Sequence, residues 1–123
     1  MIADDRRRSI LLVDDESDVI ESLVPLLEKN GLVVTSFTDS QLAYDHVRQT
    51  GFDYHALVAD VRMPAMNGFE LARRLKMLKP QLKTILITGF EINSITLDKL
   101  KDSSEVDHVL YKPVSAKSIL GLL

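Results

Sequence analysis

The sequence lacks cysteine, a net positive charge and any long apolar run, and each absence removes a class of protein. Without cysteine the chain has neither disulfide bridges nor thiolate metal ligands. No apolar run approaches the roughly 20 residues that a membrane-spanning helix needs. Residues 1–9 also lack the apolar stretch of a signal peptide. We therefore expect a cytoplasmic protein that makes no membrane contact.

The negative net charge and the absence of glycine-rich phosphate-binding motifs argue against two further classes of protein. The chain carries 15 basic and 18 acidic residues and a net charge of −3, which offers no general attraction for nucleic acid. It has no GxGxxG or GxxxxGK[ST] loop of the kinds that bind nucleotide phosphates. A flavin- or nucleotide-binding module therefore lacks support, and direct binding of nucleic acid is not expected.

The length of 123 residues allows one domain with a single core. We expect a flexible leader over residues 1–9, which holds the only basic cluster, and one domain over residues 10–123. The apolar residues from Ile119 to Leu123 would form an awkward free terminus. They lead us to expect an output domain or a further helix in a longer natural chain.

Five short apolar runs alternate with helical patterns along the chain. Because parallel neighbouring strands need crossover connections, this alternation predicts an α/β fold, a parallel sheet with helices on both faces. The expected strands are 10–13, 32–37, 55–60, 85–87 and 109–111. The expected helices end at Gly31 with a kink at Pro25, end near Gly51, begin at an Asn67–Glu70 capping box, and begin after Ser115. Residues 91–107 give a weak pattern, and the stretch over residues 89–107 is expected to be mobile.

Polar side chains stand at the ends of four of these runs. Asp14 and Asp15 follow the first run, and Asp60 ends the third. Thr88 ends the fourth run, and Lys112 follows the fifth. In a doubly wound sheet these strand ends share one edge, so we expect the five side chains to converge there. Each has an ordinary explanation by itself, as a helix cap, a turn or a solvated charge, but the coincidence at four strand ends favours a site.

The chemistry of such a site follows from its charges. Each pair of carboxylates about 4 Å apart costs on the order of 4 kcal/mol at an effective dielectric near 20. Oxygen ligands without histidine or cysteine predict Mg²⁺, or else Mn²⁺. A hard cation, a lysine and a hydroxyl around a carboxylate suit a phosphoryl group, with Asp60 as the nucleophile. A Mg²⁺-dependent phosphohydrolase is the alternative, although that class usually has a second acid where this chain has Arg62.

These motifs resemble those of the receiver domains of two-component response regulators. The matching segments are LVDDE at 12–16, DVRMP at 60–64 with NG at 67–68, TG at 88–89 and KP at 112–113. The resemblance extends from residue 9 to residue 123. It implies a flavodoxin-like doubly wound (βα)5 fold whose five-stranded parallel sheet has the order 2-1-3-4-5.

The resemblance also implies how the acidic residues act. Asp60 would accept a phosphoryl group from the phosphohistidine of a sensor histidine kinase or a phosphotransfer protein. Asp15 and Asp60 would ligate Mg²⁺ directly and Asp14 through water, while Arg62 would contribute its backbone carbonyl. The chain would then catalyse only its own phosphoryl transfer and slow autodephosphorylation, and would not be an enzyme in the ordinary sense.

The remaining matches concern the response to phosphorylation. Thr88 and Lys112 would contact the phosphoryl oxygens, and the bond from Lys112 to Pro113 is expected to be cis. Phosphorylation would favour binding of an output domain or partner protein at the face of the fourth helix, fifth strand and fifth helix. A homodimer is also compatible with the sequence.

Three positions shape these expectations further. The family usually has an aromatic residue three positions before the lysine, where this chain has Val109, while Tyr111 lies one position before it. We therefore expect the coupling between phosphorylation and partner binding to run through Thr88 and the backbone.

Phe90 should hinder the water that attacks the phosphoryl group and so slow its hydrolysis. A pseudo-receiver that is never phosphorylated is the remaining alternative.

Overall fold

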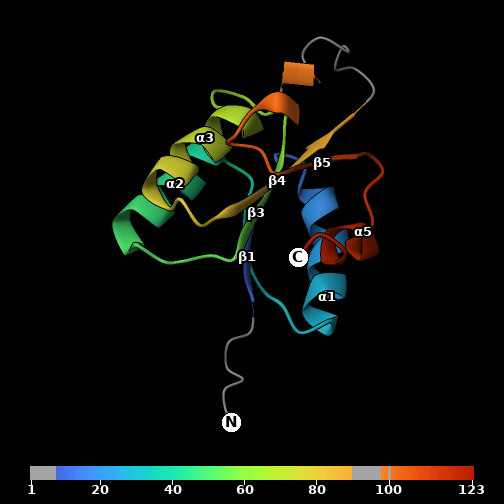
Figure 1. The fold of residues 1–123 in the computed structure, drawn as a ribbon. Helices are drawn as coiled ribbons and strands as arrows, with labels where there is room; N and C mark the ends of the chain where they lie inside the picture. Colours follow the sequence, from blue (N-terminus) through green and yellow to red (C-terminus); the bar gives the residue numbers. More distant parts are fainter. Residues whose placement is uncertain (1–7, 90–97, 100) are drawn as a thin grey trace.

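The structure is a computed structural model that describes residues 8–89, 98–99 and 101–123. Five parallel strands form one sheet in the order β2-β1-β3-β4-β5, which confirms the expected fold (Figure 1). The strands are β1 (Ser9–Val13), β2 (Val33–Phe37), β3 (Ala56–Asp60), β4 (Lys83–Thr88) and β5 (His108–Tyr111). The helices are α1 (Ser17–Lys29), α2 (Ser40–Thr50), α3 (Gly68–Leu78) and α5 (Ala116–Leu120).

Two expectations fall partly outside the described residues. The leader over residues 1–9 includes residues 1–7, and the stretch over 89–107 includes residues 90–97 and 100. Phe90 belongs to the second group, so its effect on hydrolysis stays a prediction. Among the described residues, no helix is both long enough and apolar enough to cross a membrane.

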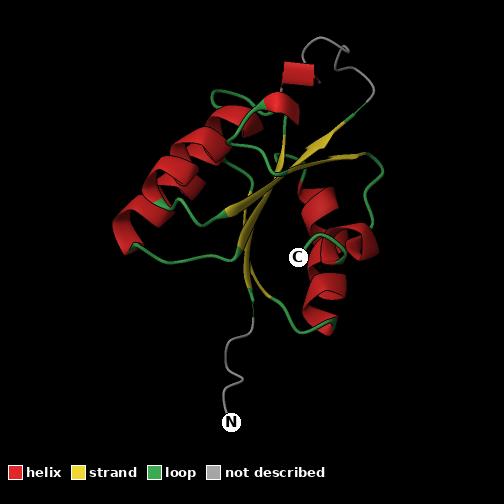
Figure 2. Cartoon of the chain, viewed as in Figure 1, coloured by secondary structure: helices red, strands yellow, loops and turns green. Residues whose placement is uncertain are grey.

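The central strands are buried on both faces, because successive side chains of a strand point to opposite sides of the sheet. In β1, Leu11 and Val13 pack with residues of α2 and α3. Ile10 and Leu12 point the other way and pack with residues of α1 and α5. Figure 2 shows the resulting three layers, with the sheet between the two helix pairs. This sandwich holds the carboxyl ends of the strands rigidly at one edge.

The helix boundaries agree with the local signals in the sequence. Gly51 ends α2 at a φ of 67°, and Gly31 follows α1 at a φ of 89°, in the left-handed region that favours glycine. The α1 helix continues through Pro25. Ser115 caps α5 by accepting a hydrogen bond from the Ser118 N–H, as expected.

The capping box at the start of α3 forms only in part. The Asn67 side chain accepts a hydrogen bond from the Glu70 N–H at 2.8 Å, as expected for an N-cap. The Glu70 carboxylate instead pairs with Arg73 at 2.6 Å and with Arg74 at 2.7 Å. Two guanidinium groups one turn away offer charge-assisted hydrogen bonds, which are stronger than a bond from a neutral backbone N–H.

The loop between β3 and α3 holds one residue in an unusual conformation. Ala65 has a φ of 65°, which L-residues with a Cβ adopt at an energetic cost. The neighbouring Met66 carbonyl accepts a 2.7 Å hydrogen bond from the buried hydroxyl of Ser40 on α2. This bond clamps the loop from the side, and the loop in turn carries Asn67 and Gly68 to the end of β3.

Replacing Ala65 tests the strain in this loop. We expect Ala65→Asn to raise the free energy of unfolding by about 1 kcal/mol, because asparagine tolerates the left-handed region better than alanine. Ala65→Val should lower it, because a β-branched side chain is disfavoured there. Urea denaturation of the three proteins measures both changes. Equal stabilities of the alanine and asparagine forms would contradict the expectation.

Candidate functional site

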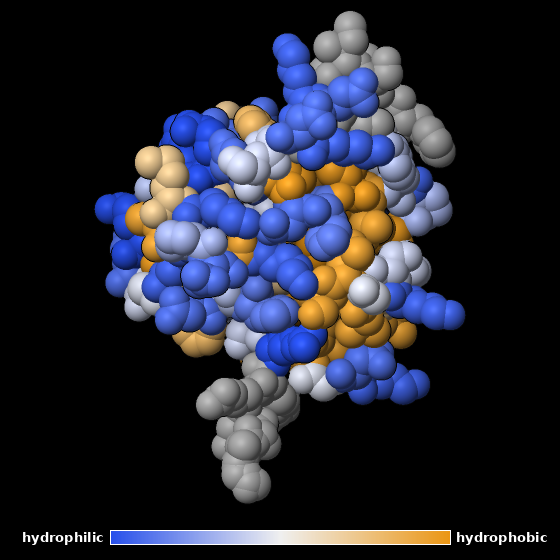
Figure 3. Space-filling view, viewed as in Figure 1, coloured by the Kyte–Doolittle hydropathy of each residue, from blue (hydrophilic) through white to orange (hydrophobic). Residues whose placement is uncertain are grey.

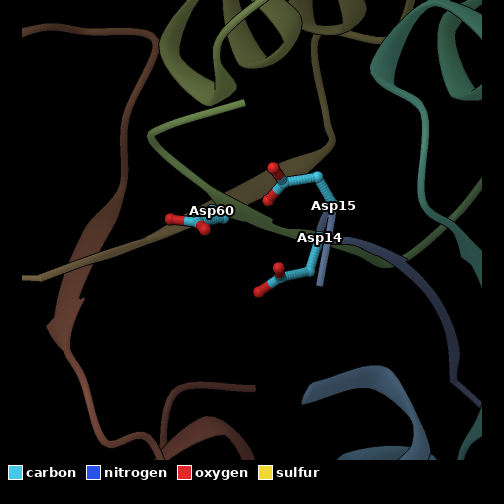
Figure 4. Close-up of side chains that lie close together, drawn as sticks. All are labelled: Asp14, Asp15 and Asp60. Carbon is cyan, nitrogen blue, oxygen red and sulfur yellow. The ribbon is translucent and has the colours of Figure 1, made fainter. Parts of the chain in front are cut away.

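Three aspartates meet at the carboxyl edge of the sheet, as the sequence predicts. Asp14 and Asp15 follow β1, and Asp60 ends the adjacent strand β3. One carboxylate oxygen from each residue lies within 4.8 Å of those from the other two. Figure 4 shows the side chains of Asp14 and Asp15 pointing toward that of Asp60. The pairing of β1 with β3 therefore brings together carboxylates that are 45 or more residues apart in the chain.

Asp14 is the most constrained of the three. It is 1% exposed, and its Oδ1 accepts a 2.9 Å hydrogen bond from the Glu16 N–H. Its Oδ2 is buried and has no hydrogen-bond partner among the described residues. Burial raises the pKa of Asp14 to about 6 against the effect of the Glu16 N–H, and repulsion from Asp60 adds to the increase. An ionised Asp14 therefore lowers the stability of the folded protein, because no cation of the described residues makes an ion pair with it.

Lys112 is the cation of the site. Its Nζ donates to Asp60 Oδ2 at 3.0 Å and also to Glu16 Oε1 at 3.0 Å. Burial by itself lowers the pKa of Lys112, but the hydrogen bonds to Asp60 and Glu16 outweigh it, so the pKa lies above its ordinary value. The sequence predicted the contact with Asp60 but missed the contact with Glu16. The expected cis bond between Lys112 and Pro113 is confirmed.

Thr88 lies at the same edge, but its hydroxyl makes no hydrogen bond to Asp60. It is 1% exposed, and its hydroxyl donates a long 3.3 Å bond to the Gly89 carbonyl. The Thr88 carbonyl accepts a 2.8 Å bond from the Lys112 N–H, which ties the ends of β4 and β5 together. The hydroxyl is therefore at the edge of the sheet that holds the site, and its one bond to a described residue is weak.

Backbone groups of the segment that follows β3 hold the phosphoacceptor candidate Asp60 in place. It is 4% exposed, and its Oδ1 accepts a long 3.4 Å bond from the Arg62 N–H. The Gly68 N–H donates to the Val61 carbonyl at 2.9 Å, so the start of α3 lies directly against the end of β3. A Cβ on Gly68 would overlap the Asp60 carbonyl oxygen and lie 2.8 Å from its carbonyl carbon. Only glycine permits this approach, which sequence reasoning did not foresee.

The donor atoms of the site fit a hard divalent cation. All three side chains offer carboxylate oxygens. One oxygen of Asp14, Oδ2, has no hydrogen-bond partner among the described residues. A cation bound by Asp14, Asp15 and Asp60 would remove their mutual repulsion. Such ligands are those that Mg²⁺ or Mn²⁺ prefers.

A cavity of about 490 Å³ opens beside Lys112, between α1 and the segment that follows β5. Its charged residues are Glu16 and Lys112, and apolar side chains form most of the remaining wall: Val19, Leu23, Ile87, Pro113 and Val114. Figure 3 shows apolar surface on this side of the molecule, over α1 and α5. The acidic site therefore adjoins a surface that is largely uncharged.

Comparison with known proteins agrees with this geometry. The family model described as response regulator receiver domain matches residues 10–123. The response regulator receiver protein CpdR of Brucella abortus is 36% identical over 114 residues, which cover 93% of this chain and 92% of that protein. The response regulator protein TodT of Pseudomonas putida is 31% identical over 97% of this chain, which spans only 51% of TodT.

Solved structures share the same fold. A response regulator receiver domain from Clostridium thermocellum superposes with a TM-score of 0.81 at 25% identity, covering 91% of this chain and 87% of that one. The chemotaxis protein CheY4 of Vibrio cholerae also gives a TM-score of 0.81, at 20% identity and over 94% of this chain and 95% of that one, which shows a common fold. With the family match over nearly the whole chain, these similarities show that the chain belongs to the response regulator receiver domain family.

Proposed function

We propose that the domain accepts a phosphoryl group on Asp60, in a reaction that requires Mg²⁺ or Mn²⁺. The observation that carries the proposal is the position of Asp60, which is buried beside two further carboxylates and bonded to Lys112 at 3.0 Å. The donor would be the phosphohistidine of a sensor kinase or phosphotransfer protein. The downstream partner would be an output domain or a separate protein, as in other response regulators.

The transfer would proceed by attack of an Asp60 carboxylate oxygen on phosphorus. The new P–O bond forms as the P–N bond to the donor imidazole breaks, and the imidazole nitrogen keeps the electron pair. Lys112 is already within hydrogen-bond distance of Asp60 and would bind a phosphoryl oxygen as a point charge. When held by Asp15, Asp60 and the Arg62 carbonyl, and by Asp14 through water, the cation would offset the charge of the phosphoryl oxygens.

Thr88 would transmit the event to the rest of the molecule. Among the residues that the structure describes, its hydroxyl bonds only to the Gly89 carbonyl, at 3.3 Å, so a phosphoryl oxygen offers it a stronger acceptor. Because the Thr88 carbonyl accepts a hydrogen bond from the Lys112 N–H, a shift of Thr88 also acts on the end of β5.

Tyr111 on β5 is 44% exposed and lies in the face that we propose for partner binding. Val109 packs partly buried in the core on the α2 and α3 side.

Mass spectrometry after incubation with acetyl phosphate and Mg²⁺ tests the proposal. We expect the wild type to gain one phosphoryl group, and both Asp60→Asn and wild type with EDTA to gain none. Label on another residue, or label that persists in Asp60→Asn, would refute the assignment of Asp60. Steady release of phosphate would indicate a phosphohydrolase, and an unlabelled wild type would indicate a pseudo-receiver.

A further inference from the structure

The residue at the start of α1 breaks a local rule. Glu16 occupies the N-cap position, where a short polar side chain normally accepts a hydrogen bond from the first turn. Glutamate is not among the favoured residues there, and Glu16 makes no side-chain cap. Its carboxylate instead lies 3.0 Å from Lys112 Nζ, 96 residues away in the sequence. A helix terminus left without its cap indicates that the side chain serves another purpose.

The geometry around Lys112 shows what that purpose is. A lysine ammonium has three donors on a flexible four-carbon stem. One donor goes to Asp60 Oδ2 and a second to Glu16 Oε1, each at 3.0 Å. The third donor makes no hydrogen bond to any residue that the structure describes. Glu16 approaches from the solvent side, where its side chain is 63% exposed, whereas that of Asp60 is 6% exposed. The ammonium is thus held between an inner and an outer carboxylate.

We propose that Glu16 is a positioning residue, which holds the ammonium of Lys112 over Asp60 while the phosphoryl group is transferred. The inference rests on the proposed function. When Asp60 becomes an acyl phosphate, the electron pair of the broken bond leaves with the donor group, Asp60 is no longer an anionic carboxylate, and the phosphoryl oxygens become the anionic acceptors to which Lys112 must turn. The bond to Glu16 can persist through that change, because Glu16 does not take part in it. The free donors of Lys112 then remain directed at the phosphoryl oxygens, and the stem does not swing toward solvent.

Replacing Glu16 with a better cap separates this role from a structural one. In Glu16→Ser the serine can cap α1, so the melting temperature should equal or exceed that of the wild type. Labelling by acetyl phosphate should nevertheless slow about two- to fivefold, the range that a partly exposed ion pair supports. A purely structural role would move stability and labelling in the same direction. Unchanged or faster labelling of Glu16→Ser would overturn the proposal.

Two further variants complete the test. Asp18→Asn also removes one negative charge at the start of α1 but leaves the hydrogen bonds of Lys112 unchanged. This variant should take label at the wild-type rate. In a Lys112→Met background, Glu16→Ser should slow labelling no further, because the lysine on which it acts is gone. A further slowing of the double variant would show that Glu16 acts by another route.

A second readout does not depend on phosphorylation. The ¹⁵Nζ resonance of Lys112 should be resolved in the wild type and broadened by solvent exchange in Glu16→Ser. If the wild type takes no label, the proposed function fails, but this resonance still tests the contact. The same resonance in both proteins would overturn the role of Glu16 even in a chain that is phosphorylated normally.

Discussion

Gly68→Ala is expected to lower the free energy of unfolding by about 3 kcal/mol or more, at the upper end of overpacking effects. The added Cβ would lie 2.8 Å from the carbonyl carbon of Asp60 and 3.1 Å from Val61 Cα. These are backbone atoms of a buried strand, so no side chain can rotate away to make room. The end of β3 and the start of α3 must separate instead.

The same movement displaces Asp60, the proposed phosphoacceptor. We expect Gly68→Ala to take label from acetyl phosphate about 10²-fold more slowly, because a displacement of 1 Å can cost that much in a positioned reaction. Labelling is measured below the melting temperature of the variant, with circular dichroism to show that it is folded.

Gly121→Ala provides the matched control. A Cβ at this position would lie 3.5 Å and 3.6 Å from its nearest neighbours, which is ordinary contact. Its φ of −66° also suits alanine. This variant should retain wild-type stability and labelling. If Gly68→Ala behaved in the same way, the proposed contact between α3 and Asp60 would not constrain the site.

Asp14→Asn is expected to stabilise the metal-free domain at pH 7 by about 2 to 3 kcal/mol, with the upper value corresponding to the full pKa difference. The pKa of Asp14 rises from its ordinary 3.8 to about 6, chiefly because the carboxyl is buried. The folded state therefore holds a proton between pH 3.8 and about 6 that the unfolded state has released. The free energy of unfolding falls as the pH rises through this window, and the full penalty remains above it.

The pH dependence and the metal dependence should both change in the variant. Urea denaturation between pH 4 and pH 7, a range set by that pKa shift, should show a decline in stability for the metal-free wild type that Asp14→Asn lacks. Mg²⁺ should raise the melting temperature of the wild type much more than that of the variant, because the variant loses one carboxylate of the group.

Asp15→Asn separates the two effects. Asp15 is exposed and belongs to the same carboxylate group, so its replacement should weaken Mg²⁺ binding without stabilising the metal-free protein. A metal-free Asp14→Asn protein no more stable than Asp15→Asn would contradict the expected penalty for burying Asp14.

The sequence was informative wherever a signal is local. Apolar runs and helical spacing predicted the strands because alternation and 3.6-residue periodicity are properties of neighbouring residues. The convergence of Asp14, Asp60 and Lys112 followed from one topological rule about parallel sheets. The capping box at Asn67 was only half right, because the competing arginines act through side chains whose rotamers the pattern does not show.

Other features depended on contacts between distant segments. The bond between Glu16 and Lys112 joins residues 96 positions apart, and nothing in either local pattern indicates it. The approach of Gly68 to Asp60 depends on how α3 meets the sheet. The strained φ of Ala65 likewise accompanies the contact of its loop with Ser40 on α2.

Asp14 and Asp15 show where the division lies. The sequence by itself determined that two adjacent carboxylates follow a buried strand, because apolar residues end and acidic ones begin there. Only the tertiary structure decided that Asp14 is buried, with one oxygen that has no hydrogen-bond partner among the described residues, while Asp15 is exposed. Burial and charge–charge distances arise from the pairing of β1 with β3 and from the reach of Lys112, which follows β5, to Asp60, and they set the energy of each carboxylate.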